Sequence, residues 1–110
     1  MSGYDELRQI GVDIERIGRW MLVEKQRCTT ADEIKVLFRE TQRKTVALLD
    51  RFKALKLTAE ERRNAGLFKD GLKLMIAANK AGAAGRWQKA KRLGEESQVS
   101  IAKYLEVIRR

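Results

Sequence analysis

The apolar residues of this chain recur at alternating steps of three and four, and this pattern occurs in four separate runs along 110 residues. The first run occupies Leu7, Ile10, Ile14, Ile17 and Met21. The later runs occupy residues 34–55, 68–79 and 87–108. A repeat close to 3.5 residues places such side chains along one face of a helix. The pattern therefore predicts four amphipathic helices whose apolar faces pack together.

Two capping boxes mark where two of these helices begin. In Thr30-Ala-Asp-Glu33 and Thr58-Ala-Glu-Glu61, the threonine is expected to cap the helix and the glutamate to reach back to the threonine amide. Both boxes also place carboxylates in a first turn, where the helix dipole favours negative charge. The second and third helices are therefore expected to start beside Thr30 and Thr58.

Glycines mark the end of the third helix. Gly82 suits the position just after a helix, and Gly85 is expected to open the turn into the fourth helix. The predicted helices are 4–27, 30–56, 59–81 and 86–109.

Short connections between these segments force successive helices to run antiparallel. The expected fold is all-α: one domain over residues 1–110, built as an antiparallel up-down-up-down four-helix bundle. The 3.5-residue period predicts left-handed, heptad-type packing with crossing angles near about +20°.

The chain has no histidine and one cysteine, Cys28, which excludes most chemistry known inside helical bundles. Di-iron bundles use Glu-x-x-His pairs, cytochrome-like bundles need axial ligands that are mostly histidine, and zinc sites need Cys or His clusters. Histidine-dependent nucleophilic triads are excluded as well. We therefore expect no enzyme activity, no metal, no cofactor and no small-molecule substrate.

The expected location is the cytoplasm. The first residues lack the basic and then apolar start of a signal peptide, and no apolar run approaches the roughly 20 residues of a membrane span. A lone cysteine also fits a reducing compartment. We therefore expect no membrane association, while the role of Cys28 stays open.

Positive charge is concentrated in the later part of the chain. The net charge is +9, from 24 basic and 15 acidic residues. Residues 1–27 are neutral, whereas residues 28–57, 58–81 and 82–110 carry +3, +2 and +4. A balance of this size favours phosphate-rich or acidic partners. The alternative is that the charge only keeps the protein soluble.

Projection at 100° per residue places cations on the outer faces of the last two predicted helices. The candidate nucleic-acid-binding residues are Arg62, Lys69, Lys73, Lys80, Arg86, Lys89, Lys91, Arg92, Lys103 and Arg110. If the two helices are adjacent, these cations merge into one surface that holds an RNA or DNA backbone without reading its sequence. The alternative is a set of solvated outer faces. Trp87, within the densest basic segment, is expected in the core.

A second candidate surface lies on the first helix. Trp20 falls outside its apolar seam, and Val12 and Val23 lie on its outer side. Tryptophan is a common interface anchor, and Gly11 and Gly18 would let another helix approach closely. This predicts a chaperone-like or adaptor module that receives an amphipathic helix, or a homo-oligomer. The alternative is that Trp20 lies flat over the bundle edge.

Overall fold

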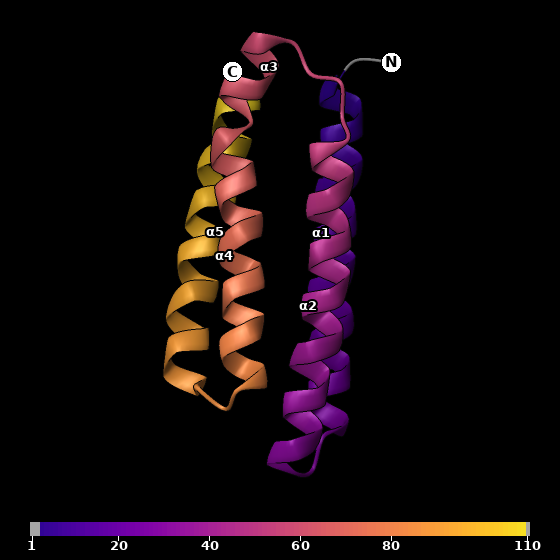
Figure 1. Cartoon of the computed structure of the whole chain (residues 1–110), viewed down its shortest axis with the longest axis vertical. Helices are drawn as coiled ribbons and strands as arrows, with labels where there is room; N and C mark the ends of the chain where they lie inside the picture. The colour runs from indigo at the N-terminus through magenta and orange to yellow at the C-terminus, as the bar shows by residue number, and fades with distance from the viewer. Residues whose placement is uncertain (1–2, 110) are drawn as a thin grey trace.

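A computed structural model describes residues 3–109, and the secondary structure in that range is entirely helical (Figure 1). The helices are α1 (Gly3–Arg27), α2 (Ala31–Lys53), α3 (Ala59–Asn64), α4 (Gly66–Ala83) and α5 (Trp87–Arg109). The molecule measures 45 × 23 × 20 Å, and its four long helices follow the long axis. The prediction of an all-helical chain is confirmed, and the helix packing is that of a bundle.

The helices pack in chain order. Helix α1 packs against α2, α2 against α4, and α4 against α5, while short α3 contacts α4 and α5. The turns that join α1 to α2 and α4 to α5 lie at one end of the molecule, which we call the turn end (Figure 1). Helix α3 lies at the opposite end, which we call the α3 end.

Both predicted threonine caps are present. The Glu33 backbone N–H donates to Thr30 Oγ1 at 3.2 Å, so α2 begins at Ala31. Thr58 forms the full capping box, because its N–H donates to the Glu61 carboxylate at 2.9 Å and the Glu61 N–H donates to Thr58 Oγ1 at 3.1 Å. The local sequence therefore sets these two helix starts.

The third predicted helix, 59–81, is interrupted, which corrects the prediction. Helix α3 ends at Asn64, Ala65 forms a fully buried joint, and α4 begins at Gly66. Asparagine and glycine are both weak helix formers, so the chain bends here at small cost. The Asn64 side chain also donates to the Tyr4 hydroxyl at 3.1 Å, which ties α3 to α1.

Gly85, and not Gly82, is the residue that terminates α4. Gly85 has a φ of +80°, its N–H donates to the Gly82 carbonyl at 3.0 Å, and the Arg86 N–H donates to the Ala81 carbonyl at 2.9 Å. This is the Schellman arrangement, in which glycine adopts the left-handed conformation at no steric cost. Gly82 lies inside α4 instead, where a Cβ would collide with the Phe38 ring.

The large apolar side chains gather at the α3 end. The buried cluster there contains Leu7, Ile10, Leu48, Leu49, Phe52, Ala65, Phe68, Leu72 and Tyr104. The Phe68 ring lies 5.1 Å from that of Tyr104 and 5.8 Å from that of Phe52. Aromatic contacts of this kind add to the burial energy, so this end is the well-packed half of the bundle.

Toward the turn end, the buried side chains other than Leu37 are small or polar. They include Thr41, Thr45, Ala78, Asn79, Ala90 and Ser97. The two threonines return their hydroxyl bonds to their own helix, and Ser97 Oγ donates to the Gly71 carbonyl at 2.9 Å. Small side chains fill little volume, so this half of the bundle cannot close as tightly as the other half.

Candidate functional site

An open groove separates α1 from α5. Helix α1 packs against α2, and it has no comparable packing with α5 along residues 3–109. The space between them has a volume of about 540 Å³ and is lined mainly by apolar atoms. A closed four-helix bundle would bury this face, so the groove is the feature of this fold that calls for a functional explanation.

The α1 wall of the groove combines large side chains with a gap. Ile14, Ile17 and Met21 line the wall from the seam, and Leu22 stands at its rim with 65% of its surface exposed. Gly18 lies one turn before Leu22, and a Cβ built there would meet nothing within 4 Å. The rim therefore carries one projecting apolar side chain beside one open space.

The α5 wall is also built from small and apolar residues. Gly94 and Ala102 alternate along it with Ile101 and Leu105, and Leu105 is 37% exposed. A Cβ at Gly94 would likewise meet nothing within 4 Å. With a rise of 1.5 Å per residue, the walls over residues 14–25 and 90–105 are about 17 and 22 Å long, which is three to four helical turns.

The floor of the groove contains one polar side chain that has no hydrogen-bond partner among the described residues. Asn79 of α4 is only 5% exposed, and its side chain makes no hydrogen bond to another described residue. Tyr104 carries the one side-chain polar atom among the described residues that is both sealed from solvent and unpaired. The Asn79 amide is not such an atom, and Asn79 is one of the residues that line the groove.

Charge in the groove is sparse. Glu15 and Lys25, both on the α1 wall, are the charged residues among its described lining. Glu15 lies 3.5 Å from Arg19, four residues further along α1, whereas Lys25 makes no ion pair with a described residue. A nearly neutral apolar surface suits an apolar partner and does not suit a polyanion.

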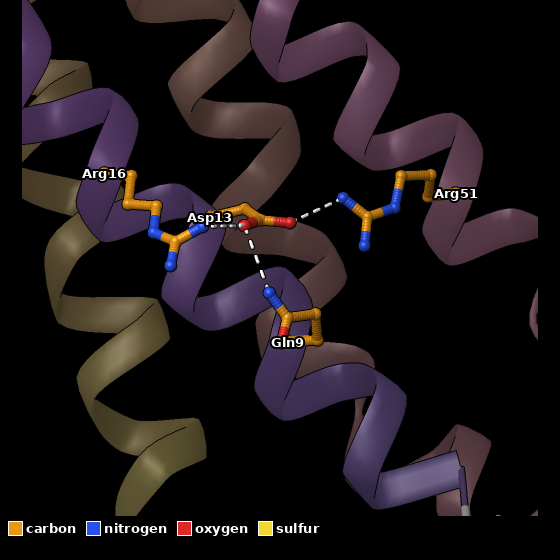
Figure 2. Close-up of polar contacts among 4 residues, drawn as sticks. All are labelled: Gln9, Asp13, Arg16 and Arg51. Atoms are coloured by element: carbon orange, nitrogen blue, oxygen red, sulfur yellow. Dashed lines mark hydrogen bonds and ion pairs between the residues drawn. The ribbon is translucent and has the colours of Figure 1, made fainter.

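Asp13 of α1 is the centre of a set of polar contacts, one of which joins α1 to α2 (Figure 2). The Arg51 guanidinium donates to the Asp13 carboxylate at 2.6 Å, and Gln9 and Arg16 approach the same carboxylate at 3.3 and 3.8 Å. The hydrogen bond from Arg51 is the main reason that the pKa of Asp13 is lowered. The contact from Arg51 therefore links α1 to α2 directly.

Trp20 contributes to the same attachment. The Lys44 ammonium of α2 lies 4.3 Å from the centre of the Trp20 ring, a cation–π contact, and the ring is half-buried. Lys44 makes no ion pair with a described residue, so this contact with the ring is its recorded interaction. Val12 and Val23, the other two candidates of this surface, are exposed.

The described cations proposed for nucleic-acid binding are exposed, except for half-buried Lys69. Arg110 lies outside the described residues. The ion pairs among residues 3–109 lie within α1 or join Asp13 to Arg51, so Arg62, Lys73, Lys80, Arg86, Lys89, Lys91, Arg92 and Lys103 take no part in one.

The α4 cations point away from α5. Gly71 marks the side of α4 that meets α5, since a Cβ there would collide with the Ile101 side chain. Lys69, Lys73 and Lys80 lie about 160–180° around the helix from Gly71. These lysines therefore lie on the side of α4 opposite α5.

Trp87 and Cys28 do not line the groove. Trp87 is 43% exposed, with its ring 6.0 Å from that of Phe38, and so is not the core residue expected. The Cys28 thiol donates to the Glu24 carbonyl at 3.4 Å. Among the described residues, no three Cys, Asp or Glu side chains gather to hold a metal, and no helix is long and apolar enough to cross a membrane.

Sequence reasoning missed the groove and Leu22. Leu22 lies off the three-four seam of α1, so the period does not select it. The sequence signal that could have identified Leu22 is its position one helical turn after Gly18, with both residues outside the seam. A glycine at that spacing leaves open space next to the projecting leucine side chain.

Together, the fold and the groove define a helical-bundle protein with an open apolar face between its first and last helices. Comparison with family models, with curated proteins and with solved structures finds no match to this chain.

Proposed function

We propose that this chain is a cytoplasmic protein-binding module that holds an apolar helix in the groove between α1 and α5. The observation that carries the proposal is the apolar groove itself, which Asn79 lines from α4. Burying apolar surface contributes about 25 cal/mol per Å², so a covered groove is favoured over a solvated one. The proposal includes no catalytic step.

The shape of the groove favours a helix as its occupant. Its walls are about three to four turns long and run along the helix axes. Gly18 and Gly94 leave space on both walls, which lets a helix backbone approach closely. The Asn79 amide would meet a polar group on the bound helix, because leaving it unpaired in a dry interface costs about 1–3 kcal/mol.

The proposed binding function depends on the order in which the helices are arranged around the bundle. We interpret the chain as an up-down-up-down bundle with left-handed packing, in which α3 and α4 together form the third arm. In such a bundle the first and fourth arms are neighbours, and here the groove takes the place of their contact. A helix bound in the groove would complete the bundle.

Binding of the neutral apolar dye Nile red to dilute protein tests this function. We expect fluorescence to rise with the wild-type chain and to stay near the free-dye value with Gly94→Leu, whose side chain fills the groove. The matched control is Gly66→Leu, because Gly66 also has nothing within 4 Å of a built Cβ but does not line the groove. Equal fluorescence from wild type and Gly94→Leu would contradict the proposal.

A second candidate function is association with a nucleic-acid backbone. The specific observation in its favour is that the exposed cations described in α4 and α5 make no ion pair with another described residue, while Arg8, Arg16, Arg19 and Arg27 of α1 are each paired with a carboxylate. Unpaired cations are free to replace the counterions of a phosphate backbone. Because the α4 lysines lie opposite α5, such binding would have to use more than one face of the molecule.

A further inference from the structure

We propose that the groove is filled by α1 of a second copy of this chain, in a twofold symmetric and antiparallel pair. This rests on the proposed function and names its partner. The surface involved, called here the α1 rim, consists of Glu15, Gly18, Leu22 and Lys25, all of which line the groove. The inference comes from the order of these four residues.

The apolar half of the α1 rim is complementary to itself. When two copies of α1 run antiparallel about a twofold axis midway between Gly18 and Leu22, each Leu22 lies opposite Gly18 of the partner subunit. Leu22 is 65% exposed in the single chain, and the space beside Gly18 is open. A twofold interface uses the same patch on both subunits, so one projection and one gap on each chain make two identical contacts.

The charged half of the α1 rim is complementary in the same register. Glu15 and Lys25 flank Gly18 and Leu22 at equal distances along the helix, so the antiparallel pair places Glu15 opposite Lys25 of the partner subunit, twice. A parallel pair would place like charges together, which disfavours it. Lys25 makes no ion pair within the described chain, and the exposed Glu15–Arg19 contact competes only weakly for Glu15.

The second copy is the occupant that fits these residues best. Its Leu22 is the most exposed of the large apolar side chains in the described chain, and the groove is the cavity that this side chain borders. An interface centred on the α1 rim would also cover Leu105 on the α5 wall. Val23 lies beside Leu22 in sequence but does not line the groove, so it provides a matched control.

Light scattering after size exclusion, over a range of protein concentrations, tests the proposal on the full chain. The wild type is expected to reach twice the chain mass of 12.7 kDa as concentration rises. Leu22→Lys and Gly18→Leu are expected to weaken association by about 100-fold or more, the scale expected when an apolar side chain leaves an interface. Val23→Lys should associate as the wild type does. Circular dichroism checks that each variant keeps its helices.

A charge reversal then tests the register. Glu15→Lys alone and Lys25→Glu alone are each expected to weaken association by about 10-fold, and the double variant is expected to restore it. A double variant no better than the single ones would overturn the antiparallel register. Equal loss in Val23→Lys and Leu22→Lys would overturn the α1 rim as the interface.

The proposed function and this inference can fail separately. A wild type that stays monomeric at every concentration but binds Nile red in the groove overturns the second copy as occupant and leaves the binding module standing. A monomer that binds no dye overturns both.

Discussion

Arg51 of α2 and Asp13 of α1 form the ion pair that joins two helices in the described chain, with 2.6 Å between guanidinium nitrogen and carboxylate oxygen. The pair lies where α1 meets α2, and the Trp20–Lys44 contact lies along the same seam. Both contacts lie on the side of α1 that faces α2, whereas Ile14, Ile17 and Met21 line the groove.

Replacing Asp13 with Asn is expected to lower the free energy of unfolding by about 0.2–1 kcal/mol at neutral pH, because the pair is partly exposed. The native pKa of Asp13 is lowered, so its contribution is present above the unfolded pKa of roughly 3.9 and disappears as pH falls through the lower native value. Urea unfolding from pH 7 to pH 2 measures the difference. A gap between wild type and variant that persists at pH 2 would contradict this interpretation.

Tyr104→Phe is expected to leave stability unchanged or to raise it by about 1 kcal/mol, because the hydroxyl is sealed in the core without a hydrogen bond. Burial raises the pKa of Tyr104 to about 12, so the wild type should also lose stability as pH rises from 10 to 12. The variant should lack that part of the loss. A clear destabilisation of Tyr104→Phe at pH 7 would show that the hydroxyl has a partner in solution.

Asn79→Leu is expected to stabilise the single chain by about 1 kcal/mol, since it removes an unpaired and nearly buried amide from an apolar surface. Urea unfolding at low protein concentration measures the effect, with Thr45→Val as the comparison. The Thr45 hydroxyl donates to the Thr41 carbonyl at 2.8 Å, so this control is expected not to stabilise. Destabilisation by Asn79→Leu would mean that the amide is already satisfied in the free protein.

If the second candidate function holds, replacing Lys69, Lys73 and Lys80 with Gln should flatten the dependence of nucleic-acid affinity on salt. Each lost phosphate contact lowers the slope of log K against log salt by about 1. The control replaces Arg8, Arg16 and Arg19 with Gln, because these arginines are already paired within α1. Fluorescence anisotropy at two salt concentrations measures both. Equal slopes in the two triple variants, or no binding at about 50 mM salt, would rule out these lysines.

Local sequence signals predicted the helix starts well. Thr30 and Thr58 cap α2 and α3 as expected, because a cap depends on residues only three positions apart. The break at Ala65 and the shift of the helix end from Gly82 to Gly85 were not predicted. Both depend on tertiary contacts: Ala65 is buried among other helices, and Gly82 accommodates Phe38.

The groove could not be predicted from periodicity. The heptad pattern shows which face of each helix is apolar, but it does not show how much space the seam residues fill. Gly94, Ala90 and Asn79 occupy seam positions of the pattern and leave α1 and α5 apart. The position of Trp20 outside the seam favours a partner surface, whereas in the structure its ring contacts the Lys44 ammonium of α2.

The rate of thiol labelling at position 94 tests the central claim most directly, namely that the groove is open in the single chain and covered in the complex. In a Cys28→Ser background, a cysteine placed by Gly94→Cys should react quickly at low protein concentration and at least about 10-fold more slowly where the mass has doubled. The comparison is Val99→Cys, at an exposed position of α5, which should react at one rate throughout. A thiol at 94 that is inert in dilute protein, or equally reactive in monomer and dimer, would contradict the claim.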